Sequence, residues 1–232
     1  MARILNIETS TDYCSVSISN DGKCTNLRLM QPDNTRKAAH SEMLAVFVKE
    51  VLDEAELKVS DLDAVALSGG PGSYTGLRIG ASTSKGLCFG GDIPLISVNT
   101  LLVIAAMAKA KYNAEYDLIV PMIDARRMEV YTMLTNAKLD KLSEVEAKII
   151  DAESFSEHKG KKLLFCGNGA PKCKDVLAHE GFSFIDDIYP SAEFMGELSE
   201  TAFRAGEFED LVYYEPFYLK EFIATTSKKS LF

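Results

Sequence analysis

The strongest constraint on the fold is a pattern that occurs in both halves of the chain. An apolar segment ends in a carboxylate at Ile7-Glu8 and again at Ile123-Asp124, and a short polar turn and a second apolar segment follow each time. In the same register, Cys14-Ser15-Val16 aligns with Val130-Tyr131-Thr132. Both halves later contain a strand-like segment that ends in a glycine turn and leads into a predicted helix. Chance and internal duplication both stay open as explanations, and duplication predicts two related α/β lobes with a cleft between them.

Hydrophobic periodicity predicts the elements of each lobe. Apolar residues recur every three or four positions from Met43 to Ala55, which predicts a helix that begins at His40. Asn20-Asp21-Gly22 predicts a hairpin turn, because an Asp-Gly pair accepts positive φ. Further strands are expected at 3–7, 14–19, 23–30, 64–67, 93–98, 118–123, 129–134 and 163–166, and further helices at 74–88, at 101–112, after Pro171 and at 192–205. We expect two domains, residues 1–104 and residues 105–232, the second with a closing tail.

The charge balance argues against a chain that binds RNA by itself. With 25 Lys and Arg against 34 Asp and Glu, the formal net charge is −9. RNA-binding proteins instead gain affinity from basic surfaces that displace counterions. Basic pairs such as Arg126-Arg127 and Lys161-Lys162 are scattered along the chain, and we interpret them as solvated surface.

Targeting and redox signals predict a cytoplasmic protein that does not enter membranes. The first residues, Met1-Ala2-Arg3, lead directly into an apolar strand without the shape of a signal peptide. The longest apolar run, Leu101 to Ala108, is far shorter than the ~20 residues of a membrane span. The five cysteines are an odd number with no close pair, which is typical of free thiols in a reducing compartment.

The sharpest local feature is a glycine-rich turn, residues 69–80, between a predicted strand and a predicted helix. Such a turn can bind phosphate through backbone N–H groups at a helix N-terminus. The known phosphate spacings fail here, because Gly76 comes one residue late for a dinucleotide loop and Lys85 does not follow a glycine as a P-loop requires. Pro71 also rules out a hydrolase elbow around Ser73. A purely structural turn and a ligand site both stay open.

Gly76, Gly80 and Ser84 recur every four residues and form a nearly bare ridge on the predicted helix. A glycine inside a helix costs roughly 1 kcal/mol relative to alanine, so a compensating close contact is expected. That contact is either with the helix from His40 or with a partner subunit. In the second case, the ridge and the stripe from Met43 to Ala55 would be partly exposed, as partner sites are. The interface residues predicted for that case are His40, Met43, Phe47, Val51, Gly76, Arg78, Gly80 and Ser84.

A vestigial nucleotide cleft is predicted between the lobes, marked by Glu8, Ser10, Asp124, Arg126, Gly167 and Gly169. Its carboxylates are either general acid/base groups or caps of the turns that follow them. The loops after these carboxylates, 9–12 and 125–128, contain no glycine to wrap a phosphate, so we expect a degenerate cleft. The three histidines lie outside any zinc motif, and we predict neither a metal nor a cofactor.

The segment Gly70-Pro71-Gly72-Ser73-Tyr74-Thr75-Gly76-Leu77-Arg78-Ile79-Gly80 resembles the signature of the TsaB (YeaZ) family, with the signature turn at Gly70, Pro71, Gly72, Ser73, Tyr74, Thr75 and Gly76. Further matching segments occur in the family's order at 4–15, 40–41, 123–131, 167–170 and 216–220. The resemblance therefore covers nearly the whole chain. Two residues depart from the family pattern, because Glu8 replaces a common Asp and Arg127 stands where a small residue is frequent.

The resemblance implies an α/β fold of the actin-like (ASKHA, ribonuclease H-like) type, with two lobes and mixed sheets. It also implies a scaffold, without activity of its own, in the synthesis of N6-threonylcarbamoyladenosine at position 37 of ANN-decoding tRNAs. In that pathway a TsaD-like paralogue holds the metal and carries out the transfer, and a TsaE-like ATPase completes the assembly. A homodimer is the alternative state of the isolated chain, and tRNA is reached only through the complex.

Three other classes stay open. An ATP-dependent phosphotransferase of the same fold would use the two carboxylates of the cleft. A glycoprotease-like peptidase would need a nucleophile elbow or a zinc motif, and the sequence contains neither. A homodimeric interaction protein unrelated to tRNA would use the same bare ridge.

Overall fold

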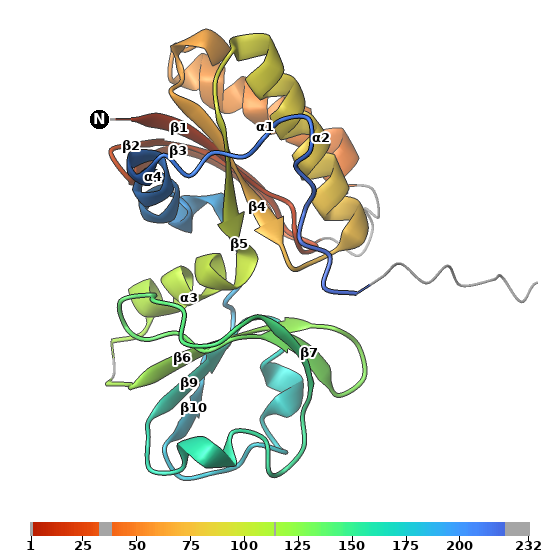
Figure 1. The fold of residues 1–232 in the computed structure, drawn as a ribbon, viewed down its shortest axis with the longest axis vertical. Helices are drawn as coiled ribbons and strands as arrows, with labels where there is room; N and C mark the ends of the chain where they lie inside the picture. Colours follow the sequence, from red (N-terminus) through yellow and green to blue (C-terminus); the bar gives the residue numbers. More distant parts are fainter. Residues whose placement is uncertain (1, 33–38, 114, 221–232) are drawn as a thin grey trace, which may run out of the picture.

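The computed structural model describes residues 2–32, 39–113 and 115–220, which form two α/β lobes arranged along the long axis (Figure 1). The first lobe contains a five-stranded sheet in the order β3-β2-β1-β4-β5. Its elements are β1 (Arg3–Glu8), β2 (Cys14–Asn20), β3 (Lys23–Met30), α1 (Ala39–Glu54), the 3-10 helix η1 (Val59–Asp61), β4 (Ala64–Gly70), α2 (Tyr74–Gly91) and β5 (Leu95–Asn99).

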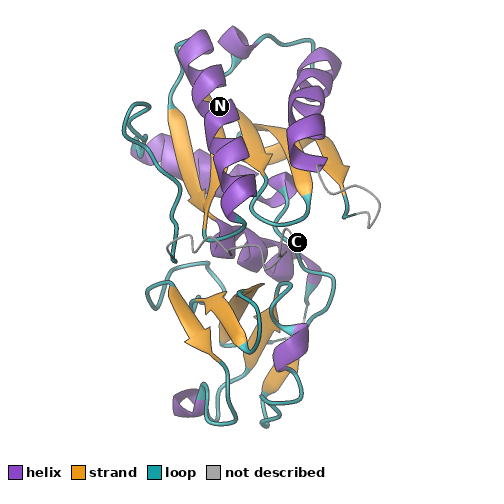
Figure 2. Ribbon diagram, turned by 90° about the vertical axis from the view of Figure 1, so that its right-hand side faces the viewer, coloured by secondary structure: helices purple, strands orange, loops and turns teal. Residues whose placement is uncertain are grey.

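The second lobe contains the other five-stranded sheet, in the order β10-β9-β6-β7-β8. Figure 2 shows the strands of the two sheets one above the other, with helices between them. The remaining elements are α3 (Thr100–Lys111), β6 (Leu118–Asp124), β7 (Glu129–Thr132), β8 (Glu146–Ile149), η2 (Ser156–His158), β9 (Leu163–Cys166), η3 (Pro171–Cys173), β10 (Phe182–Phe184), η4 (Ala192–Phe194) and α4 (Gly196–Ala205).

The two sheets have the same topology, which confirms the predicted pair of related lobes. In the first, β1 and β3 pair antiparallel with β2, whereas β1, β4 and β5 run parallel. In the second, β6 and β8 pair antiparallel with β7, whereas β6, β9 and β10 run parallel. This mixed order is the one expected of the actin-like fold. It places Glu8 and Asp124 at equivalent positions, each at the end of the first strand of its lobe.

Both faces of the first sheet are covered, so its central strands are almost completely buried. Leu5 and Ile7 of β1 pack in one cluster with Phe47 and Val51 of α1. Ile4 belongs to the cluster on the other face, which includes Met195 beside α4. Because successive side chains of a strand point to opposite faces, a strand covered on both sides reads as a continuous apolar run.

Within its described residues, the second lobe has no counterpart of the long helices α1 and α2. The helix predicted to begin at Pro171 is present only as η3, a 3-10 helix of three residues that begins at Pro171. The outer face of this sheet is instead covered by loop residues, since Phe155 and Leu177 pack on Phe165 of β9. The helix predicted at 192–205 is divided into η4 and α4. The short strands β8 and β10 were not predicted from the sequence.

The packing of the helices crosses the predicted domain boundary. Residues 104 and 105 both lie inside α3, which packs against β6 of the second lobe. The helix α4 comes late in the chain but packs on β1 and β5, and Figure 1 shows it (blue) beside the first sheet. The segment after α4 also returns to the first lobe, where the Glu209 N–H donates to the Leu95 carbonyl at 2.9 Å. Of the helices described, none combines the length and the apolar character that a membrane span requires.

Candidate functional site

The glycine turn places the N-terminus of α2 directly against the loop that follows β1. Ser73 caps α2, because its Oγ accepts a hydrogen bond from the Gly76 N–H at 3.4 Å. The Ser73 N–H itself donates to the Ser10 carbonyl at 2.6 Å. Thr9 Oγ1 donates to the Gly76 carbonyl at 2.8 Å. The Ser73 and Gly76 N–H groups, which could otherwise bind a phosphate at this end of α2, therefore already donate to acceptors within the chain.

The bare ridge of α2 is buried within the monomer, so the predicted exposure of Gly76, Gly80 and Ser84 is wrong. A Cβ built on Gly76 would lie 2.0 Å from the Thr9 carbonyl oxygen, and one on Gly80 would lie 2.4 Å from Thr9 Oγ1. The compensating contact of Gly76 and Gly80 is thus with the loop after β1. The glycines let this loop approach the helix more closely than any side chain would allow.

The inner part of the α1 stripe is also buried. Phe47 is 7% exposed and Val51 is inaccessible, because both pack on the first sheet. Met43 is partly buried against the same cluster. The predicted exposure is therefore wrong for Phe47 and Val51. Arg78 is exposed and donates to the Tyr74 hydroxyl at 3.1 Å, whereas the side chain of His40 lies outside the described residues.

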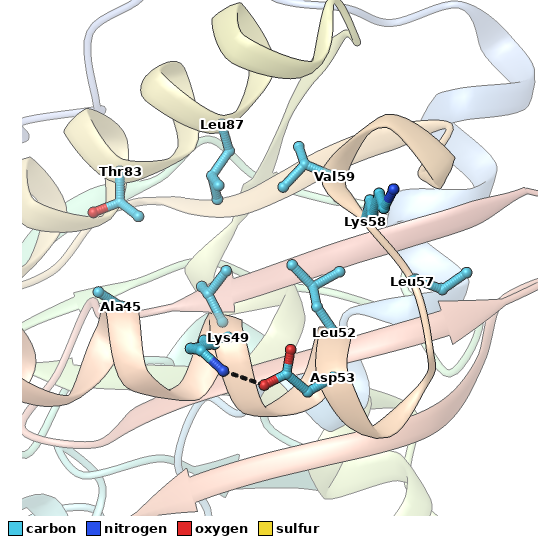
Figure 3. A pocket seen from close by; sticks show the side chains of 10 residues that line it. Ala45, Lys49, Leu52, Asp53, Leu57, Lys58, Val59, Thr83 and Leu87 are labelled. Atoms are coloured by element: carbon cyan, nitrogen blue, oxygen red, sulfur yellow. Dashed lines mark hydrogen bonds and ion pairs between the residues drawn. The ribbon is translucent and has the colours of Figure 1, made fainter.

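An apolar groove of about 370 Å³ lies between α1 and α2, the two helices on which the interface was predicted, but none of its lining residues was among the predicted interface residues (Figure 3). Its walls bear an ion pair between Lys49 and Asp53 of α1. Beyond these residues, Val46 of α1 is 42% exposed and Phe89 of α2 is 85% exposed. The residues that line the groove are Ala45, Val48, Lys49, Leu52, Asp53, Leu57, Lys58, Val59, Thr83 and Leu87. We call the exposed surface of these two helices, which includes the groove, Val46 and Phe89, the α1–α2 face.

The predicted cleft residues form two clusters, one at the end of each central strand. In the first lobe, Glu8 is buried and its Oε1 accepts from the Ser10 N–H at 2.6 Å and from Ser10 Oγ at 2.5 Å. In the second lobe, Asp124 accepts from the Arg126 N–H at 2.7 Å and from Lys172 Nζ at 2.5 Å. Each carboxylate thus closes the turn that follows its strand, which favours the interpretation as turn caps.

The glycines predicted for the cleft belong to the second cluster. A Cβ on Gly169 would lie 3.1 Å from the Asp124 backbone nitrogen, and one on Gly167 would lie 2.3 Å from the Met122 carbonyl oxygen. The intervening Asn168 accepts from the Asp124 N–H through Oδ1 at 3.0 Å. These residues therefore pack the turn after β9 against the end of β6.

The five thiols are unpaired, and burial holds most of them in the protonated form. Burial, with a smaller effect from the Glu8 charge, raises the pKa of Cys14 to about 12. Burial raises the pKa of Cys88 to about 11 and also raises that of Cys166. A thiol with a raised pKa is a poor nucleophile at neutral pH. Within the described ranges, no three His, Cys, Asp or Glu side chains gather as a potential metal site.

Comparison with known proteins assigns the chain to a family. Residues 31–213 match the family described as TsaD, tRNA N6-adenosine threonylcarbamoyltransferase. The chain is 30% identical to the tRNA threonylcarbamoyladenosine biosynthesis protein TsaB of Escherichia coli K12, over 96% of each chain. It is 33% identical to the TsaB protein of Bacillus subtilis 168, over 75% of each chain.

A solved structure shares the fold over nearly the full length. YeaZ from Pseudomonas aeruginosa superimposes with a TM-score of 0.82 at 24% identity, covering 94% of this chain and 100% of that chain. The duplicated mixed sheets, the glycine signature and the sequence matches agree with one another. The chain therefore belongs to the TsaB family of tRNA threonylcarbamoyladenosine biosynthesis proteins and shares the TsaD-type domain.

Proposed function

We propose that this chain is a non-catalytic subunit in the formation of N6-threonylcarbamoyladenosine in tRNA, and that it acts by holding a TsaD-like paralogue through its α1–α2 face. Membership of the TsaB family supports the place in tRNA modification. The observation that carries the non-catalytic role is the hydrogen bond from the Ser73 N–H to the Ser10 carbonyl, because it fills the N-terminus of α2 with the chain's own loop.

The helix terminus matters because a glycine turn at a helix N-terminus is a general way for a protein to hold phosphate. Backbone N–H groups at a helix N-terminus attract anions only when they point at open space. Here Thr9 and Ser10 lie on the first turn of α2, and the Gly76 N–H is used by the Ser73 cap. Phosphate binding through the Ser73 or Gly76 N–H would require these hydrogen bonds to break.

The α1–α2 face supports the pairing. Phe89 of α2 is the most exposed large apolar side chain among the described residues, and the groove between α1 and α2 is lined mainly by aliphatic side chains. Apolar patches of this kind mark protein interaction sites. The match of residues 31–213 to the TsaD family implies that a TsaD-like paralogue has a related first lobe. Two related faces can then pack around a pseudo-twofold axis, as in isologous dimers.

The proposal also includes a homodimer, a TsaE-like partner and indirect contact with tRNA. A second copy of this chain could use the α1–α2 face to form a homodimer when the paralogue is absent. A TsaE-like ATPase is the further proposed partner, on the strength of the family resemblance. The net charge of −9 supports a chain that reaches tRNA as part of the complex rather than alone.

The pairing is tested by placing a charge on the α1–α2 face. We expect Phe89→Asp to abolish co-elution with the TsaD-like paralogue while leaving the melting temperature unchanged, because the side chain is 85% exposed. Ile149→Asp is the matched control, since Ile149 is 72% exposed but lies on β8 of the second lobe. Equal co-elution of wild type and Phe89→Asp would show that the paralogue binds elsewhere.

A further inference from the structure

The turn between β6 and β7 contains two consecutive arginines in an unfavourable backbone conformation. Arg126 has φ of 73° and Arg127 has φ of 50°, and both side chains are exposed. The left-handed region is costly for residues with a Cβ and is normally filled by glycine or asparagine, above all in two-residue hairpin turns. We call residues 124–129 the arginine turn.

The arginine side chains do not build this turn. The Ala125 N–H donates to the Glu129 carbonyl and the Glu129 N–H donates to the Arg126 carbonyl, both at 3.1 Å. Asp124 Oδ1 accepts from the Arg126 N–H at 2.7 Å. None of these contacts uses an arginine side chain, so glycine or asparagine at positions 126 and 127 would preserve them without the strain. A strained residue at a position where an unstrained residue would support the same turn points to a function.

The charges around the turn leave the two guanidinium groups uncompensated. Asp124 is paired with Lys172, and Glu129 is paired with Lys220. Among the described residues, neither Arg126 nor Arg127 forms an ion pair. The turn is therefore a local site of positive charge on a chain whose net charge is −9.

Tyrosine rings extend the surface toward the first lobe. Lys220 contacts Glu129 of the arginine turn, and two residues earlier Tyr218 lies with its ring centroid 5.0 Å from that of Tyr74. The Arg78 guanidinium lies 5.4 Å from the centre of the Tyr74 ring. Both rings are half-buried. Cations alternating with aromatic rings are typical of surfaces that contact phosphates and bases of single-stranded nucleic acid.

We propose that the arginine turn contacts the phosphate backbone of RNA. Neither the groove of the α1–α2 face nor the second described cavity, beside Tyr213 and Phe217, includes a residue of this turn. Two exposed arginines on a turn suit an extended anion, which can contact both along its length. Arginine also presents a planar fork of donors that matches phosphate. This inference rests on the proposed function and deepens it, and it replaces the interpretation of Arg126-Arg127 as plain solvated surface.

The test uses the complex of this chain with the TsaD-like paralogue and measures tRNA affinity as a function of salt. The double variant Arg126→Asn/Arg127→Gly gives the turn its preferred residues and removes two charges. Loss of two phosphate contacts makes the negative slope of log K against log salt shallower by about 1–2. It also weakens the tRNA affinity in about 0.1 M salt by roughly 10- to 50-fold. Relief of strain raises the melting temperature by roughly 2–6 °C.

The matched control removes the same charge from the same lobe. Lys159 and Lys161 are exposed and precede β9, whereas the arginine turn follows β6. Since β6 and β9 are parallel, these lysines lie at the opposite end of the sheet. Lys159→Gln/Lys161→Gln should leave the slope and the affinity unchanged.

The outcomes separate the two proposals. If the wild-type complex modifies tRNA and the arginine variant keeps both the affinity and the salt slope, the inference about the turn is overturned and the proposed function stands. An equal loss in the lysine control would also overturn it, because the effect would then reflect net charge alone. If the wild-type chain fails to support modification, the proposed function itself is wrong.

Discussion

Replacing Gly76 by alanine is expected to disrupt the packing of the loop after β1 against α2 and so to lower the free energy of unfolding. A Cβ at position 76 would lie 2.0 Å from the Thr9 carbonyl oxygen, and Cβ atoms essentially never come within 3.0 Å of another heavy atom. The carbonyl must therefore move by at least 1.0 Å, the difference between these two distances. The obstacle is backbone, so rotation of a side chain cannot relieve it.

The cost follows from three contributions. Overpacking costs about 1–3 kcal/mol. Weakening the hydrogen bonds from Thr9 Oγ1 and from the Ser73 N–H costs about 1 kcal/mol each. Alanine recovers about 1 kcal/mol of helix propensity relative to glycine. We expect the free energy of unfolding to fall by about 2–4 kcal/mol, which is a fall in melting temperature of roughly 5–15 °C for a chain of this size.

Gly86 provides the matched control within the same helix. It is exposed, and a Cβ built there meets nothing within 4 Å. Gly86→Ala should therefore raise the free energy of unfolding by about 0.5–1 kcal/mol. Thermal and urea unfolding of both variants measure the two effects. If Gly76→Ala were as stable as Gly86→Ala, the ridge would be open in the isolated chain and its assignment to the loop after β1 would be refuted.

Two further predictions concern the carboxylate clusters and the buried thiols. Asp124→Asn should leave tRNA modification by the complex within about twofold, because an amide oxygen can still accept from the Arg126 N–H; a loss of more than about 100-fold would indicate an acid/base role. Burial raises the folded-state pKa of Cys14 to about 12 and of Cys88 to about 11, from the ordinary thiol value of 9.0. Because both pKa values are raised on folding, the neutral thiols contribute their full stability below about pH 9, and this contribution is lost as the pH rises through the 9–12 window. Urea unfolding between pH 8 and 11 checks this, and a free energy of unfolding that increased with pH over that range would contradict it.

The architecture was largely predictable because it depends on short-range patterns. The apolar segments of β1 and β2, the Asp21-Gly22 turn and the equivalent carboxylates Glu8 and Asp124 were enough to predict two related lobes. The edge strands β8 and β10 were missed because they are short and partly or largely exposed. The helix expected from Pro171 is only the short η3, and residues distant in sequence, including Phe155, cover that face of the sheet.

The candidate site was predictable only in part. The spacing of Gly76 and Gly80 indicated that something approaches α2 closely, but a spacing of four residues identifies the face of a helix and not the group that packs on it. The group is Thr9, which is 67 residues away from Gly76 in the sequence. The groove of the α1–α2 face combines Leu52, Val59 and Leu87 from three elements, so no local pattern reveals it. The positive φ of Arg126 and Arg127 likewise opposes local propensity.

The most direct test of the central claim is a reconstituted reaction in which N6-threonylcarbamoyladenosine in tRNA is quantified with and without this chain. The threonylcarbamoyl donor, the TsaD-like paralogue and the TsaE-like ATPase are kept constant. We predict that the modified nucleoside forms only when this chain is present, that Phe89→Asp reduces it in parallel with pairing, and that this chain without the paralogue forms none. Formation of the nucleoside by this chain in the absence of the paralogue, or at the full rate in its own absence, would contradict the account.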